Sequence, residues 1–249
     1  MGDGASRAGA FGATGRQEVV RVGLIGLFVT ALVTAQLTAA KVLAFDSPVS
    51  VPLVGDQLVL PGASLAIAVM FFASDCYAEL FGRRATQVVV NVAFAMNFVV
   101  LALVWSTILA PAAPSSIEPA AFREVLGAST NIVAGSLLAY LVSQNWDVIA
   151  FDAIREYTDG AHLWLRNVGS TATSQAIDTV LFVSVAFWAV PQFAGIGPVL
   201  PTAVVLQLVV GQYLLKLLIA LADTPFVYAV VRAGRVSGFE WGGVDPGPQ

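Results

Sequence analysis

The sequence has little of the chemistry on which most enzymes and metal proteins rely. It contains one cysteine, Cys76, and one histidine, His162. A single cysteine excludes an intrachain disulfide and a thiolate metal cage. A single histidine leaves the usual zinc and general-base arrangements without their commonest residue. We therefore expect neither a metal nor a cofactor.

Charge is also scarce. Only 11% of the 249 residues are charged, whereas an ordinary soluble domain has about a quarter. The formal net charge of −4 leaves no basic patch for phosphates, so a nucleic-acid partner is not expected. The chain is instead 57% hydrophobic, which is more apolar surface than a soluble core could bury. The composition indicates a protein of the lipid bilayer.

Six apolar runs are long enough to cross a bilayer, whose core of about 30 Å requires roughly 20 helical residues. Continuous apolar runs favour helices over barrel strands, which would alternate with period two. We predict an all-α polytopic membrane protein with six transmembrane helices. A secretory signal is the alternative for the first run, but that run is long enough to span and five more follow. The runs are residues 19–40, 59–80, 85–109, 125–148, 171–190 and 199–231.

The arginines predict the orientation and the domain organisation. Every second connection is basic, beginning with the segment before the first run, so both termini should be cytoplasmic in a multi-pass protein of the cell membrane. Residues 19–231 form the predicted transmembrane domain. A polar and disordered tail is expected at 1–18, and a second polar tail at 232–249. The arginines concerned are Arg7, Arg16, Arg21, Arg83, Arg84, Arg155, Arg166, Arg232 and Arg235.

Ionisable residues inside the runs are the first candidates for function, because a charge at bilayer depth costs at least about 2.5 kcal/mol and must face protein or water. Asp75 and Glu79 are four residues apart, and Gln175 and Asp178 are three apart, so each pair shares a helical face. Two such faces can meet. The alternative is ion pairing between helices, or snorkelling at an interface. Lys41, Lys216 and Asp223 are the other ionisable residues of this kind.

The most polar stretch lies between the fourth and fifth runs. It includes Gln144, Trp146 and Asp147, and further on Trp164 and Arg166. A planar, hydrogen-bonding ligand would use such rings for stacking and such carboxylates and amides to read its donor edges. The alternative for the two tryptophans is an aromatic belt at the membrane interface.

An enzyme is not favoured. His162 lies in a predicted cytoplasmic connection, where a rhomboid-type serine hydrolase could not use it. The Tyr-Asp and Gly-x-Gly-Asp settings of an intramembrane aspartyl protease do not occur.

Two groups of residues resemble the queuosine-precursor transporters, a family also described as vitamin-uptake-like transporters. The first is the Asp-x-x-x-Glu-x-x-Gly segment from Asp75 to Gly82. The second group is longer and more specific, and it consists of Ser143-Gln144, Asp147, Phe151, Thr158, Gly160, Leu163-Trp164-Leu165-Arg166, Ser170-Thr171, Ser174-Gln175 and Asp178-Thr179. The correspondence is completed by Lys41, Lys216, Thr224-Pro225 and Tyr228.

The resemblance implies a six-helix importer of 7-deazapurine precursors of modified tRNA nucleosides, such as 7-cyano-7-deazaguanine. The family is also similar to the substrate-binding components of energy-coupling-factor importers. The sequence has no Gly-x-x-x-x-Gly-Lys-Ser/Thr loop, so any ATP coupling must come from a partner. A stand-alone transporter, a capture subunit and a structural membrane protein remain as alternatives. The predicted substrate-binding residues are Lys41, Asp75, Glu79, Gln144, Trp146, Asp147, Arg166, Gln175 and Asp178.

Overall fold

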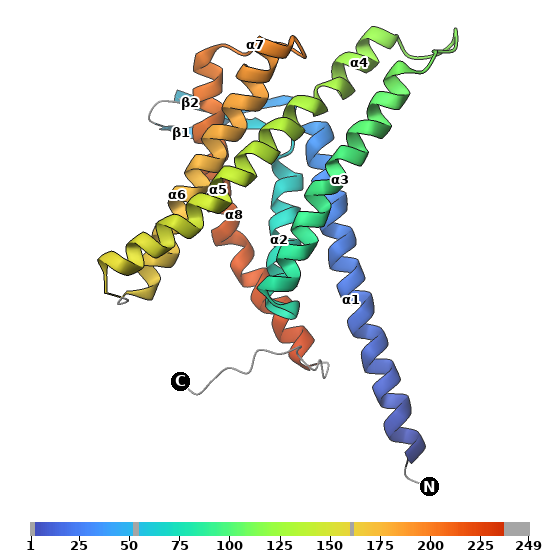
Figure 1. The fold of residues 1–249 in the computed structure, drawn as a ribbon, viewed down its shortest axis with the longest axis vertical. Coiled ribbons are helices and arrows are strands. Elements are labelled where there is room, and N and C mark those ends of the chain that lie inside the picture. The colour runs from blue at the N-terminus through green and yellow to red at the C-terminus, as the bar shows by residue number, and fades with distance from the viewer. Residues whose placement is uncertain (1–2, 52–54, 160–161, 237–249) are drawn as a thin grey trace. The chain divides into compact units, whose positions relative to one another are not determined.

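The fold consists mostly of helices (Figure 1). The computed structural model describes residues 3–51, 55–159 and 162–236. Its elements are α1 (Asp3–Thr38), β1 (Val42–Val51), β2 (Gly55–Pro61), α2 (Ser64–Phe81), α3 (Arg83–Leu109), α4 (Pro119–Gly127), α5 (Ser129–Tyr157), α6 (Leu163–Ser184), the π-helix η1 (Val185–Ala189), α7 (Val190–Ala194) and α8 (Thr202–Val236).

Six helical stretches of the described chain are long and apolar enough to span a membrane. They confirm the predicted class, an all-α polytopic membrane protein with six spans. The cytoplasmic placement of both termini stays a prediction, which accessibility labelling near Arg83 and Asp56 can check. The stretches are Gln17–Thr38, Ser64–Phe81, Arg83–Leu109, Pro119–Tyr157, Val168–Ala194 and Thr202–Val230.

Two helices extend beyond the predicted runs. α1 begins at Asp3, so most of the residues assigned to the polar N-terminal tail continue the first helix. α5 runs to Tyr157, beyond the predicted end of the fourth run at residue 148, so the polar stretch with Gln144 and Asp147 lies well inside a helix. A prediction from hydropathy ends a span at the first polar residues. The helix itself continues to its C-cap, Thr158, whose N–H donates a hydrogen bond to the Ile154 carbonyl.

A β-hairpin replaces the loop that was expected between the first two spans. β1 and β2 pair antiparallel, with Val42 opposite Pro61 and Phe45 opposite Leu58. The prediction that the second span begins at Val59 is therefore wrong, since Val59 lies in β2 and α2 starts at Ser64. Val59 and Leu60 are both buried, and a short apolar run does not distinguish a buried strand from the start of a helix.

The chain divides into two compact units, which share the long helices α1, α3 and α8. Unit 1 comprises residues 1–35, 65–96 and 217–249. Unit 2 comprises residues 36–64 and 97–216. Each unit has an interior of its own and is described separately. The division into two tails and one transmembrane domain stays a prediction.

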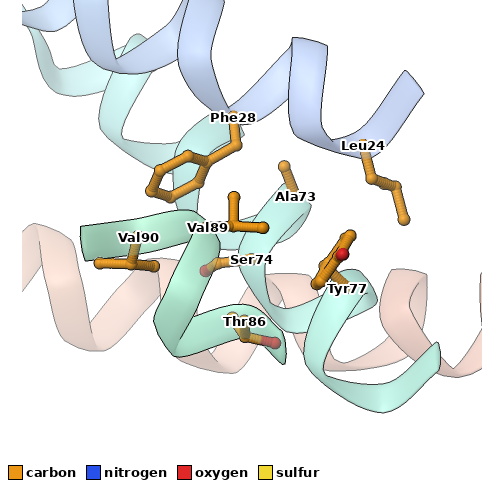
Figure 2. Close-up of a pocket in the computed structure, with 8 residues that line it drawn as sticks. All are labelled: Leu24, Phe28, Ala73, Ser74, Tyr77, Thr86, Val89 and Val90. Atoms are coloured by element: carbon orange, nitrogen blue, oxygen red, sulfur yellow. The ribbon is translucent and has the colours of Figure 1, made fainter. Parts of the chain in front are cut away.

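Apolar side chains fill the centre of unit 1. Phe28 and Leu32 of α1 are buried against Ala73 of α2 and Ala93 of α3. Figure 2 shows Phe28, Ala73, Tyr77 and Val89 around the small gap between these helices. The gap has a volume of about 10 Å³, which is at the lower limit for a single water. It is a packing defect, too small for a ligand.

Unit 2 is organised around the antiparallel pair α5 and α6, which lie side by side in Figure 1. At Gly135 of α5 the packing is close, because an added Cβ would lie 2.9 Å from the Ala186 Cβ of η1 and 3.0 Å from the Phe182 carbonyl oxygen of α6. The close contact falls where α6 widens into η1. The hairpin contacts α8 in the same unit, because Gly211 leaves room for the Val59 carbonyl.

Candidate functional site

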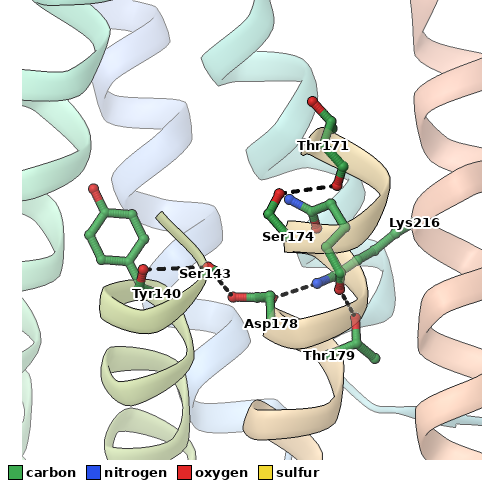
Figure 3. Close-up of polar contacts among 8 residues, drawn as sticks. Tyr140, Ser143, Thr171, Ser174, Asp178, Thr179 and Lys216 are labelled. Carbon is green, nitrogen blue, oxygen red and sulfur yellow. Dashed lines mark hydrogen bonds and ion pairs between the residues drawn. The ribbon is translucent and has the colours of Figure 1, made fainter. Parts of the chain in front are cut away.

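An ion pair lies inside unit 2, between α6 and α8. The Lys216 Nζ is 2.6 Å from the Asp178 Oδ2, and the two side chains are 8% and 25% exposed. Ser143 of α5 donates a hydrogen bond of 3.3 Å to the Asp178 Oδ1. Figure 3 shows Asp178 between Ser143 and Lys216, so three helices meet at one carboxylate.

All three residues lie within candidate membrane spans. A single buried charge at that depth would be costly, and the pairing of Asp178 with a lysine and a hydroxyl reduces that cost. The role of Asp178 in binding substrate stays a prediction.

Two further hydrogen bonds join α5 to α6 near the Asp178–Lys216 ion pair. Ser174 donates to the Asp147 Oδ1 at 3.1 Å, and the Trp146 Nε1 donates to the Thr173 hydroxyl at 3.1 Å. Ser174 precedes Asp178 by four residues, and Asp147 follows Ser143 by four, so both bonds continue the polar face of the ion pair. The structure therefore brings Trp146, Asp147 and Asp178 of the predicted set together at one helix interface.

Amide side chains extend the polar interior. Gln36, the first residue of unit 2, donates from Nε2 to the Ser136 hydroxyl at 3.2 Å. Gln212 lies one turn before Lys216 on α8 and is 3% exposed. The Oε1 atoms of Gln36 and Gln212 are buried without a hydrogen-bond partner among the described residues. Both therefore have acceptor capacity that the protein itself does not use.

Asp75 and Glu79 lie on α2, which belongs to unit 1. Both are exposed, whereas the buried residues of that helix are Ala73, Cys76, Tyr77 and Leu80. The carboxylates thus occupy the face of α2 opposite the apolar core of unit 1. At bilayer depth such a face requires protein or water against it.

The remaining predicted residues do not contact the cluster formed by Ser143, Trp146, Asp147, Ser174, Asp178 and Lys216 in any described hydrogen bond or ion pair. Lys41 is exposed at the turn between α1 and β1, where its carbonyl accepts the Gly62 N–H. Gln144 is exposed on α5, and Gln175 is half-buried on α6. Arg166 belongs to the first turns of α6, and its side chain lies outside the described residues.

Lys216 and Gln212 belong to the polar interior of unit 2 but were not among the predicted substrate-binding residues. Lys216 stood out as an intramembrane lysine but was not assigned to the site, because nothing in the sequence links it to Asp178, 38 residues earlier. Its position inside an apolar run was the available signal. Gln36 and Gln212 lacked even that signal, since a lone amide hardly changes the hydropathy of a run.

The spans and their polar interior define a class of protein. Polar and ionisable side chains that several transmembrane helices direct toward one another are typical of pathways for substrates or ions. The molecule is a multi-pass membrane protein with a polar interior of this kind.

The comparisons with known proteins agree with this class. Residues 61–230 match the family described as "Putative vitamin uptake transporter". The match covers more than half of the chain, and the protein belongs to this family. The resemblance seen in the sequence motifs is confirmed.

A curated relative carries a more specific name. The chain is 33% identical over 161 residues to the "Probable queuosine precursor transporter" of Bacillus subtilis (strain 168). The alignment covers 64% of this chain and 66% of the relative, just under two thirds of its length. No solved structure matches the chain.

Proposed function

We propose that this protein imports 7-deazapurine precursors of modified tRNA nucleosides across the cell membrane. The expected cargo is 7-cyano-7-deazaguanine or its aminomethyl relative. Family membership and the name of the Bacillus subtilis relative support the proposal. The structural observation that carries it is the pairing of Asp178 with Lys216 and Ser143 inside unit 2.

The chemistry of this cluster fits a guanine-like base. One edge of such a base presents a ring N–H and an amino group, which a carboxylate can accept together, and next to them a carbonyl, to which an ammonium can donate. Asp178 and Lys216 offer that combination. The two side chains satisfy each other at 2.6 Å, and a bound base would exchange this contact for its own.

Other residues of the predicted set take supporting roles in the proposal. Asp147 and Trp146 lie along the same interface of α5 and α6, where a carboxylate and a ring face can contact a planar ligand. Gln175 follows Ser174 on α6. Asp75 and Glu79 are proposed as a second acidic group, and Lys41, Gln144 and Arg166 as further polar contacts.

Uptake in cells tests the function directly. Cells that cannot synthesise 7-deazaguanines should accumulate the labelled cyano compound only when they carry this gene. A hypoxanthine-like analogue, which lacks the amino group, should bind roughly 5- to 100-fold more weakly, because one buried acceptor stays unsatisfied. Equal uptake with and without the gene would contradict the proposal.

Purified protein in sealed vesicles identifies the energy source. Accumulation driven by an imposed ion gradient alone supports a stand-alone carrier, which is the mechanism that we propose. Tight binding without accumulation, rescued by an ATP-hydrolysing partner, would show instead that the protein is a capture subunit. A folded protein that binds no deazapurine would leave only a structural role.

A further inference from the structure

Two buried glutamines have acceptor atoms that the proposed contacts leave unused. Gln212 and Gln36 are each 3% exposed, and the Oε1 of each has no partner among the described residues. An unsatisfied buried acceptor is destabilising, and more so where water is excluded. A group that binds between the helices and donates hydrogen bonds would remove this cost.

Both glutamines lie on the hairpin side of the ion pair. Gln212 follows Gly211, which packs against Val59 and Leu60 of β2, and Lys216 is one turn farther from that contact. Gln36 lies two residues before the end of α1 at Thr38. The Thr38 carbonyl would contact a side chain at Gly62, which follows β2 directly.

The glutamines lie one to two helical turns from the ion pair. Gln212 is about 6 Å from Lys216 along α8, and Ser136, the partner of Gln36, is about 10 Å from Ser143 along α5. A flat base that meets Asp178 with one edge therefore has its opposite edge toward the glutamines.

We infer that Gln212, together with Gln36, is a specificity-determining residue that accepts a hydrogen bond from the N9–H of a free 7-deazapurine base. The inference rests on the proposed function and assigns the residues that would recognise the N9 edge of its cargo. A guanine-like base has donors on two edges, the N1–H with the 2-amino group and, opposite them, the N9–H. A nucleoside carries its sugar at N9 and lacks that donor, so the site selects the base over the nucleoside.

The test compares 7-cyano-7-deazaguanine with its 9-methyl derivative by equilibrium binding to the purified full chain. Wild-type protein should bind the methyl derivative at least roughly tenfold more weakly, because the glutamine acceptors stay unsatisfied. Gln212→Met should weaken binding of the unmethylated base and bring the ratio of the two affinities close to one. Gln212→Glu keeps an acceptor and should keep the preference.

Gln207→Met is the matched control, because it makes the same replacement on the same helix, and its ratio should equal that of the wild type. A wild-type protein that binds both compounds equally well overturns the inference without any variant. An unchanged ratio in both Gln212→Met and Gln36→Met overturns it as well. Failure of the proposed function is distinct, since the wild-type protein would then bind neither compound.

Discussion

The interiors of the two units differ in what they bury. Unit 1 packs Phe28, Leu32, Ala73 and Ala93 and leaves Asp75 and Glu79 of α2 exposed. Unit 2 encloses an ion pair and several hydroxyl and amide groups, although it is built from the same kind of apolar helices. The same chain therefore uses two ways of filling the space between spans.

The comparison indicates which interior carries the function. Among the described residues of unit 1, the core of Phe28, Leu32, Ala73 and Ala93 packs the helices without a charged side chain. The polar groups of unit 2 are therefore not a requirement of helix packing, and each of them adds a desolvation cost that an apolar residue would avoid. An interior that retains such groups is where we expect substrate to bind.

The largest expected effect is that of Asp178→Asn. Loss of the carboxylate should reduce uptake below about 1% of the wild type, since removing one partner of a buried pair costs about 3 to 5 kcal/mol. The single variant also leaves Lys216 charged without its partner, which lowers the abundance of the folded protein. Labelled-base uptake and membrane abundance are measured together.

A double variant separates binding from packing. Asp178→Asn with Lys216→Met removes both charges, and abundance in the membrane should recover while uptake stays absent. Asp152→Asn, which changes an exposed acid on α5, is the control and should match the wild type. Recovery of uptake in the double variant would show that the pair serves only to hold α6 and α8 together.

A pair of glycine variants should reveal the tight packing of unit 2. Gly135→Leu inserts a side chain where an added Cβ already lies 2.9 Å from the Ala186 Cβ, so stability should fall by about 1 to 3 kcal/mol. Gly26→Leu in unit 1 is the matched control, because a Cβ there meets nothing within 4 Å. Melting temperatures of the purified proteins measure the difference, and equal values would contradict the contact between α5 and η1.

The carboxylates of α2 test whether unit 1 contributes more than packing. Asp75→Asn and Glu79→Gln should each lower uptake about tenfold if the side chain makes a charged hydrogen bond during transport. Neither should lower the melting temperature by more than a degree or two, because both side chains lie outside the apolar core. Parallel loss of stability and uptake would point to a helix-packing role instead.

Much of the fold could be predicted from hydropathy, since a bilayer requires long apolar helices and these are visible in the sequence. The β-hairpin could not, because Val59 and Leu60 read equally well as the start of a helix. Asp178 could be selected from its polar neighbours Ser174 and Thr179 on an otherwise apolar helix. Its partner Lys216 could not, since that contact depends on how α6 and α8 pack, and short-range patterns carry no information on such pairing.

The smallest expected effect compares one hydrogen bond from each unit. Tyr77→Phe removes the hydroxyl that accepts the Arg21 Nε–H at 3.2 Å in unit 1, and Ser174→Ala removes the donor to Asp147 in unit 2. Each bond contributes about 0.5 to 1.5 kcal/mol, so the two variants should lose similar stability. Only Ser174→Ala should lower uptake, by a few fold, because Asp147 loses the bond that orients it. Uptake at a range of base concentrations, normalised to membrane abundance, measures both. Equal uptake by the two variants would mean that the polar interior of unit 2 does not differ in function from the apolar core of unit 1.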